Sequence, residues 1–284
     1  MFIFDAHCDT LSANLDLSRN KGHFDIERAI KRGPGAQILA AFGRNQLGQL
    51  DRLRQYPASA GTAPNELYLL GAIEGGDEIA SVKDLEPFIK RDIVFFGLTW
   101  NHDNLLAGGC FGSGGGLTPL GKEAVSFLER SGVIIDLAHA SKQTFWDVLE
   151  LAKKPVAVTH ACCHALCPHP RNLDDSQMRA LRDCNGVLGI TFYPAFLNQN
   201  HPNKPTDISH VARHIEYAIE IMGTDSVGLG SDFDGCEVLP IGLEGVQDVP
   251  GLLYALDVDQ GIREKVAGRN FLDLMQRRGY ILRH

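Results

Sequence analysis

The first ten residues join an apolar stretch to side chains that can bind a metal ion. The mostly apolar run Phe2–Ala6 leads directly into His7-Cys8-Asp9. If this run is a strand, its side chains alternate between two faces, so His7 and Asp9 project from the same face at its C-terminal end. An imidazole and a carboxylate on one face form half of a site for a divalent metal. With eleven histidines in the chain, one such pair can also arise by chance.

Four more apolar runs end in a side chain that can bind a metal or carry a proton. These runs lead into Glu74, His139, His160 and Asp232. A single polar residue after a strand usually marks only the point where the chain reaches solvent. Five such ends among eight expected strands are hard to explain in that way. The set therefore predicts a metal site at which the ends of several strands meet.

Histidines and carboxylates in this number suit zinc, with manganese or iron as alternatives. Glu74 can use both of its oxygens, so we expect it to bridge two ions roughly 3.5–4 Å apart. His7 and Asp9 would complete one ion, and His139 and His160 the other. The two ions would share a hydroxide, formed from a water molecule whose pKa they lower.

Asp232 follows the last expected strand, and we assign it a different task. It would accept the proton of the attacking water and deliver it to a leaving nitrogen. Gly228 and Gly230 share its face of the strand, so the wall beneath the carboxylate is expected to be bare and to leave room for the site.

The elements that must position these side chains alternate regularly. Eight strands are expected, at Phe2–Ala6, Gln37–Phe42, Leu67–Ile73, Ile93–Thr99, Gly132–Leu137, Val156–Thr159, Val187–Phe192 and Val227–Gly230. Amphipathic helices lie between them. One is expected to open at Thr118-Pro119, the next to be capped by Ser141, a third to start at Asp207, and a last helical region to run from about residue 259 to 278. Near-continuous apolar strands are typical of parallel strands covered on both faces. In the sixth strand, Val156 and Val158 are expected to share the face of His160 and to fill the interior.

This alternation favours one α/β domain over residues 1–284, a (β/α)8 TIM-like barrel with the metal site at the C-terminal ends of the strands. A doubly wound open sheet is the alternative, because the pattern alone does not show closure.

The composition excludes several classes of protein. A hydrophobic content of 44% and a charged content of 22% are ordinary for a globular chain. The net charge of -8 is spread without blocks, which argues against nucleic acid or an anionic membrane as a partner. No stretch approaches the roughly 20 apolar residues of a membrane span, and no secretory signal is visible. Seven cysteines, an odd number, fit reduced thiols, so a cytoplasmic location is expected.

Six segments carry a resemblance to a known family. In order, they are His7-x-Asp9-Thr10, Ile73-Glu74-Gly75-Gly76, Asp136-Leu-Ala-His139, Thr159-His160, Arg171-Asn172 and Asp232-Phe-Asp-Gly235. They resemble the signature motifs of the membrane (renal) dipeptidase family, zinc peptidases of the amidohydrolase-like barrel superfamily. The resemblance implies a binuclear zinc site with the ligands named above, shared through Glu74, and Asp232 as the general acid and base.

The resemblance also implies residues that bind the substrate. Arg171 is implied as the clamp on a C-terminal carboxylate, which a guanidinium can grip through two hydrogen bonds. Without the resemblance, Arg171 would be a surface loop cation beside Pro170. Tyr193 would line the substrate pocket, or it is an aromatic residue at the edge of the core. The implied reaction is hydrolysis of dipeptides with a free C-terminal carboxylate, L-D dipeptides among them.

One departure from the family concerns the oxyanion. Some relatives carry a histidine after the fourth strand that is thought to steady the tetrahedral oxyanion, and Trp100 stands there in this chain. His102 could reach inward in its place, or it could be a solvated loop residue.

Two other functions remain open. One is another binuclear-metal amidohydrolase, acting on N-acyl amino acids or cyclic amides, and the other is a non-catalytic binding barrel. Large barrels often pair, so a homodimer is a further expectation, although no stretch identifies its interface.

Overall fold

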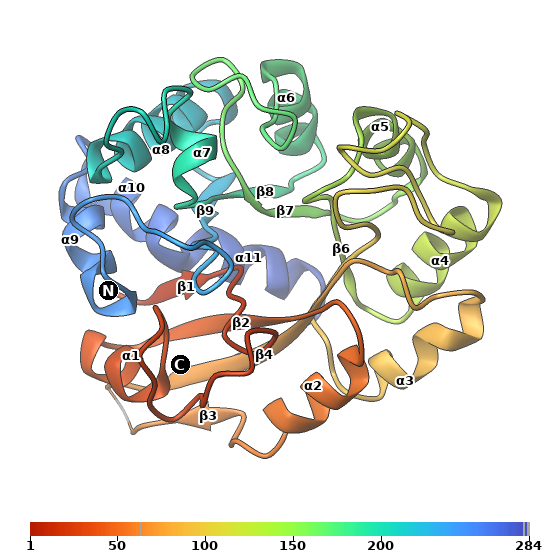
Figure 1. The fold of residues 1–284 in the computed structure, drawn as a ribbon, viewed down its shortest axis with the longest axis horizontal. Coiled ribbons are helices and arrows are strands. Elements are labelled where there is room, and N and C mark those ends of the chain that lie inside the picture. The colour runs from red at the N-terminus through yellow and green to blue at the C-terminus, as the bar shows by residue number, and fades with distance from the viewer. Residues whose placement is uncertain (63, 281, 283–284) are drawn as a thin grey trace.

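The computed structural model describes residues 1–62, 64–280 and 282, and it forms a ring of parallel strands surrounded by helices (Figure 1). Around the ring the strands pair in the order β2-β1-β9-β8-β7-β6-β5-β4, and β4 pairs back onto β2. This last pairing closes the sheet. The predicted (β/α)8 barrel is therefore confirmed, and the open sheet is excluded.

All eight predicted strands are present, with ends that differ from the expected ones by at most two residues. Their bounds are β1 (Ile3–Asp5), β2 (Gly35–Phe42), β4 (Leu67–Glu74), β5 (Phe95–Gly97), β6 (Ile134–Asp136), β7 (Ala157–Ala161), β8 (Val187–Ile190) and β9 (Val227–Leu229). A short additional strand, β3 (Ser59–Ala60), pairs antiparallel with β4.

The predicted helix starts are also confirmed. The side chains of Thr118, Ser141 and Asp207 accept hydrogen bonds from backbone N–H groups in the first turns of α4, α5 and α8. The α-helices are α1 (Ile26–Arg32), α2 (Gln46–Leu53), α3 (Glu86–Ile89), α4 (Pro119–Arg130), α5 (Lys142–Leu151), α6 (Asp175–Asp183), α7 (Pro194–Leu197), α8 (Ile208–Met222), α9 (Val249–Tyr254), α10 (Gln260–Glu264) and α11 (Asn270–Arg277). Within the part of the chain that the structure describes, no helix has the length and apolar character needed to cross a membrane.

The C-terminal helices close the N-terminal end of the barrel. A π-helical turn, η3 (Lys265–Arg269), joins α10 to α11, which lies behind the middle of the ring in Figure 1. The ring of Phe271 stacks on Phe4 with centroids 5.3 Å apart and meets Phe95 edge-on at 6.3 Å. A Cβ on Gly228 would come within 2.6 Å of the Phe271 ring. The absence of a side chain at Gly228 therefore leaves space for the ring of Phe271. The prediction that Gly228 leaves room for the metal site is wrong.

Strand β7 is irregular at the point where it enters the site. Its pairing with β8 shifts register between Val158 and Ala161, which turns His160 into the cavity. Val156 and Val158 instead pack outward, in the cluster between strands and helices. The prediction that they share the face of His160 is wrong, because the bulge interrupts the two-residue alternation. A Cβ on Gly230 would overlap the carbonyl of Thr159, so Gly230 makes room for the bulge.

Candidate metal centre

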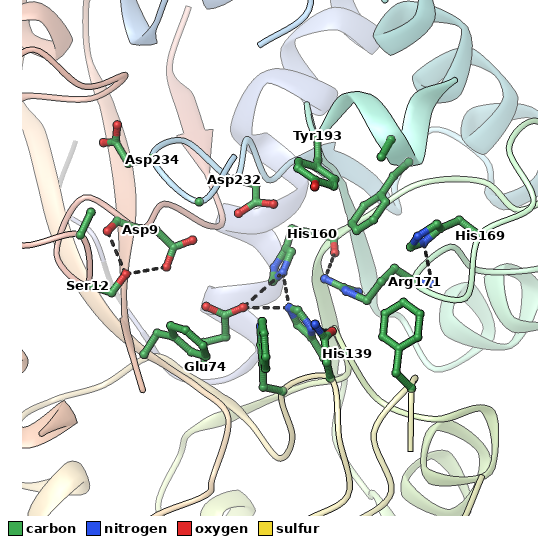
Figure 2. A pocket seen from close by; sticks show the side chains of 18 residues that line it. Asp9, Ser12, Glu74, His139, His160, His169, Arg171, Tyr193, Asp232 and Asp234 are labelled. Carbon is green, nitrogen blue, oxygen red and sulfur yellow. Dashed lines mark hydrogen bonds and ion pairs between the residues drawn. The ribbon is translucent and has the colours of Figure 1, made fainter. Parts of the chain in front are cut away.

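A cavity of about 570 Å³ opens at the C-terminal ends of the strands (Figure 2). Asp9, Glu74, His139, His160 and Asp232 line it, and each comes from a different strand or from the loop that follows it. Because the strands of a parallel barrel all point the same way, their C-terminal ends meet at one mouth. The structure thus brings together side chains that lie up to 223 residues apart, from Asp9 to Asp232.

Glu74 lies between two groups of imidazoles. Its Oε2 is 3.5 Å from Nε2 of His7, whereas its Oε1 is 2.8 Å from Nε2 of His139 and 3.8 Å from Nε2 of His160. Nε2 of His7 is in turn 3.2 Å from Oδ2 of Asp9. The two oxygens of one carboxylate therefore face the two ligand groups that the sequence assigned to separate ions.

Hydrogen bonds behind the candidate ligands decide which ring nitrogens face the cavity. Nδ1 of His160 lies 3.0 Å from Oγ1 of Thr159, and this hydroxyl donates to Oδ2 of Asp136 at 2.5 Å. Since its proton is used there, Oγ1 accepts a hydrogen bond from Nδ1–H. Nδ1 of His139 lies 2.8 Å from the acceptor Oδ1 of Asn101. Both imidazoles thus carry their proton on Nδ1 and present a bare Nε2 to the cavity.

These two bare nitrogens lie only 2.9 Å apart. Neither can donate to the other, so their lone pairs repel unless a cation lies between them or beside them. Neutral imidazoles and carboxylate oxygens are the donors that zinc and related metals take. Among the described residues, two sets of ligand atoms lie within 4.8 Å of one another, His7 with Glu74 and His160, and His7 with Asp9 and Asp232. The donor set fits a divalent metal centre.

The acid-base properties of two of the imidazoles, His139 and His160, are consistent with metal binding. Burial, and after it the charge of Arg171, lowers the pKa of His139 to about 4. Burial, followed by the charge of His7, lowers the pKa of His160 well below its usual value. Both rings are therefore neutral near pH 7, as metal-binding imidazoles must be. Burial, reinforced by the Asp9 carboxylate, raises the pKa of Asp232 well above its usual value.

Two of these side chains stand on unusual backbone. His139 has a φ of 66° and Asp232 has a φ of 63°, in the left-handed region that residues with a Cβ rarely occupy. Such conformations cost on the order of 1 kcal/mol or more and concentrate at functional sites. Here the turn follows directly after a strand in each case, and it redirects the side chain into the cavity.

Arg171 lies in the same cavity and is only 5% exposed. One of its terminal nitrogens donates to the carbonyl of His160 at 3.2 Å, and its Nε is buried with no hydrogen-bond partner among the described residues. Its guanidinium carbon lies 5.4 Å from the centre of the Phe196 ring. Arg171 is therefore not a surface loop cation. Tyr193, half-buried, lines the cavity beside it (Figure 2).

The residues after β5 differ from the prediction. His102 is exposed. Among the described residues, Trp100 and Asn101 from this segment line the cavity, but His102 does not. Because β5 already ends at Gly97, strand alternation does not extend to position 102. Asn101, which faces Nδ1 of His139, is the residue that sequence reasoning missed. Its only signal was a polar amide close after a strand end.

Comparison with known proteins places the chain in a family. Residues 57–279 match the family described as membrane dipeptidase, peptidase family M19. The chain is 37% identical over 222 residues to an uncharacterised protein in the pqqA 5′ region of Klebsiella pneumoniae, covering 74% of this chain and 82% of that protein. It is 32% identical over 217 residues to an uncharacterised dipeptidase of Schizosaccharomyces pombe, covering 73% of this chain and 52% of that protein.

Solved structures share the fold. A metallo peptidase from Rhodobacter sphaeroides, liganded with a phosphinate mimic of the dipeptide L-Ala-D-Ala, superposes with a TM-score of 0.84 at 22% identity, covering 98% of this chain and 99% of that chain. A dipeptidase of family M19 gives a TM-score of 0.84 at 23% identity, covering 98% of both chains. With the family match extending over residues 57–279, the chain belongs to the membrane dipeptidase family, peptidase family M19, and is a metal-dependent dipeptidase.

Proposed function

We propose that this dipeptidase works with two zinc ions, one held by His7, Asp9 and Glu74 and the other by Glu74, His139 and His160. The observation that carries the proposal is the position of Glu74, whose two oxygens face separate imidazoles at 3.5 Å and 2.8 Å. When bound, the ions would lower the pKa of a water molecule and polarise the carbonyl of the scissile amide.

Asp232 is proposed as the proton carrier. Its carboxylate points into the cavity between Asp9 and Tyr193 (Figure 2), with Oδ1 4.0 Å from Nε2 of His7. A carboxylate in this place would accept the proton of the attacking water on one oxygen. It would then donate that proton to the nitrogen of the leaving amine, which departs as a neutral amino group.

Arg171 is proposed to bind the C-terminal carboxylate of the substrate. A buried Nε–H without a partner costs free energy, and a carboxylate that enters the cavity would satisfy it. The scissile amide would then lie over Glu74, His139 and His160. The ligand of the Rhodobacter sphaeroides metallo peptidase, a mimic of L-Ala-D-Ala, supports dipeptides that include L-D pairs as the substrate class.

Metal analysis combined with a substrate panel tests the proposal. We expect two zinc ions per chain, and hydrolysis of L-L and L-D dipeptides. Cyclic amides and N-acyl amino acids in the same panel should react far more slowly. One metal ion per chain would contradict the binuclear site. Faster hydrolysis of a cyclic amide or an N-acyl amino acid than of every dipeptide would contradict the substrate class.

A further inference from the structure

Four rings line the Arg171 side of the cavity, and we call them the aromatic arc: Phe111, His169, Phe196 and Tyr193. Neighbouring ring centroids lie 5.9 Å apart for Phe111 and His169, 4.4 Å for His169 and Phe196, and 4.7 Å for Phe196 and Tyr193. The guanidinium of Arg171 lies against the middle of this arc, 5.4 Å from the Phe196 centroid. The arc is thus a continuous aromatic surface around one buried cation.

The rings of the arc are uncharged near neutral pH. Burial, and then the charge of Arg171, lowers the pKa of His169, so its imidazole is neutral. Nδ1 of His169 accepts a hydrogen bond from the backbone N–H of Arg171 at 3.2 Å, which fixes the ring beside the guanidinium. Burial raises the pKa of Tyr193, so its phenol is neutral as well. Such a surface suits a ligand with a carboxylate and, next to it, a large apolar or aromatic group.

The opposite side of the cavity has a different character. Asp9, Ser12 and Asp234 lie there (Figure 2), and Oγ of Ser12 donates to Oδ1 of Asp9 at 2.8 Å. Phe42 and Trp100, with ring centroids 5.1 Å apart, also line the cavity. A dipeptide whose carboxylate lies at Arg171 would extend toward this polar side with its amino-terminal residue.

In an amino acid, the carboxylate and the side chain are attached to the same Cα. A C-terminal residue whose carboxylate binds Arg171 therefore has its side chain close to the guanidinium, and the rings of the arc are the apolar surface around that guanidinium. We infer that the aromatic arc is a specificity subsite for the C-terminal residue of the substrate, and that it favours dipeptides ending in a large apolar or aromatic side chain. This inference rests on the proposed function and names its substrate class more narrowly.

Phe111 is the member of the arc that can be altered most safely. It is 46% exposed and belongs to a loop, residues 108–116, that contains six glycines. Asp103 holds this loop, because its carboxylate accepts hydrogen bonds from the N–H groups of Gly109 at 3.0 Å and Ser113 at 2.9 Å. The N–H of Phe111 itself donates to the carbonyl of Asn101 at 2.7 Å. These bonds fix the backbone of the loop, and Phe111 lies outside the buried core, so truncation of its ring should leave the core intact.

The test measures kcat/KM of the metal-loaded enzyme on dipeptides that begin with alanine and end with glycine, alanine, leucine, phenylalanine or lysine, in L and D forms. We expect the phenylalanine substrates to exceed the glycine substrate roughly tenfold or more, chiefly through KM. The lysine substrates should remain close to the glycine substrate. Phe111→Ala should reduce the phenylalanine-to-glycine ratio several-fold, and Phe111→Leu should keep most of it.

Phe42→Ala is the matched control, since Phe42 lines the cavity without belonging to the arc. It should leave the phenylalanine-to-glycine ratio of the C-terminal residue unchanged. The zinc content and Tm of Phe111→Ala should match those of the wild type. Equal kcat/KM for all C-terminal residues, or an unchanged ratio in Phe111→Ala, would overturn the inference while the proposed function stands. Failure to hydrolyse any dipeptide would overturn both.

Discussion

Asp232 differs from Glu74 in the number of imidazoles that approach it. Glu74 has Nε2 atoms of three histidines within 3.8 Å, whereas among the described residues Asp232 has only the Nε2 of His7 within 4.0 Å. Asp232→Asn keeps the size of the side chain and removes its ability to take a proton. We expect kcat to fall by roughly 10²–10⁴ with two zinc ions still bound, measured by steady-state kinetics and metal analysis. A rate near that of the wild type would exclude the proton-carrier role, and loss of an ion would make Asp232 a ligand.

Arg171 is expected to recognise the charge and shape of a carboxylate. Arg171→Ala should raise KM roughly tenfold or more for dipeptides with a free C-terminus, and it should leave C-terminally amidated analogues almost unaffected. Arg171→Lys, the control, keeps the charge but loses the forked donor geometry, so an intermediate KM is expected. Kinetics on paired free and amidated substrates provide the measurement. An equal rise in KM for both kinds of substrate would show that Arg171 does not bind the carboxylate.

The bulge of β7 positions a proposed metal ligand and its hydrogen-bond partner together. Thr159 and His160 are neighbours in the strand, and Oγ1 of Thr159 lies between Nδ1 of His160 and the carboxylate of Asp136 on β6. Thr159→Val removes this hydroxyl at almost constant volume. We expect zinc affinity to fall roughly tenfold to a hundredfold, measured by competition with a chelator. Thr99→Val is the control, because in the described part of the chain Oγ1 of Thr99 bonds only the backbone carbonyl of His139, at 3.3 Å. Equal affinities for wild type and Thr159→Val would contradict the positioning role.

Helix α8 is tied to the loop after β7 by a neutral histidine. Nδ1 of His214 accepts a hydrogen bond from the N–H of Cys163 at 3.1 Å, and its Nε2–H donates to the carbonyl of Leu197 at 3.1 Å. Burial lowers the pKa of His214 to about 4. In the unfolded chain its pKa is about 6.5, so the neutral ring contributes stability that is fully present above pH 6.5 and is lost as the pH falls toward 4.

The size of this contribution follows from the shift of the pKa. A difference of about 2.5 units between the unfolded and the folded chain corresponds to at most about 3 kcal/mol. We expect His214→Asn to be less stable than the wild type at pH 7.5, and the difference in unfolding free energy to shrink between pH 6.5 and pH 4. Urea unfolding at several pH values measures it. A difference that is constant with pH would exclude the role of His214.

The elements show which features a sequence can reveal. The helix starts at Thr118, Ser141 and Asp207 depend on hydrogen bonds within one helical turn, so local pattern predicted them. The bulge of β7 depends on room made by Gly230, about 70 residues away in the chain, and alternation alone could not reveal it. The same holds for Phe271, whose place inside the barrel is set by contacts with Phe4 and Phe95.

That Asp9, Glu74, His139, His160 and Asp232 meet at one cavity was predictable for a chemical reason. Five histidine or carboxylate side chains among eight strand ends are hard to explain by solvent exposure alone, and a barrel fold brings all strand ends to one mouth. Asn101 was not predictable, because its role is to hold His139 across two loops. His102 is the opposite case. It could reach the site only if β5 extended further along the chain, and it is exposed instead. The single domain, the cytoplasmic location and the homodimer stay predictions.

At the scale of the whole molecule, the candidate metal centre and the C-terminal segment connect strands at opposite ends of the barrel. The proposed ligands come from β1, β4, β6 and β7 or from the loops that follow them, so bound ions would join strands around much of the ring. At the other end, Arg278 and Tyr280 donate to the carbonyls of Val133 and Ile93, just before β6 and β5. Only the first of these two connections depends on metal.

Removal of metal should therefore lower the stability of the folded chain. Ions that bind only the folded state stabilise it by about 4 kcal/mol per site when free metal exceeds Kd a thousandfold. We expect chelation to lower Tm by several degrees or more, and zinc to restore it. His139→Ala, which removes a proposed ligand of one of the two proposed ions, should bind a single zinc and lose about half of the metal-dependent rise in Tm. His169→Ala is the control outside the ligand set and should keep the full rise. Calorimetry with and without zinc measures these changes, and a Tm that does not respond to metal would mean that the cluster holds no ion that links the strands.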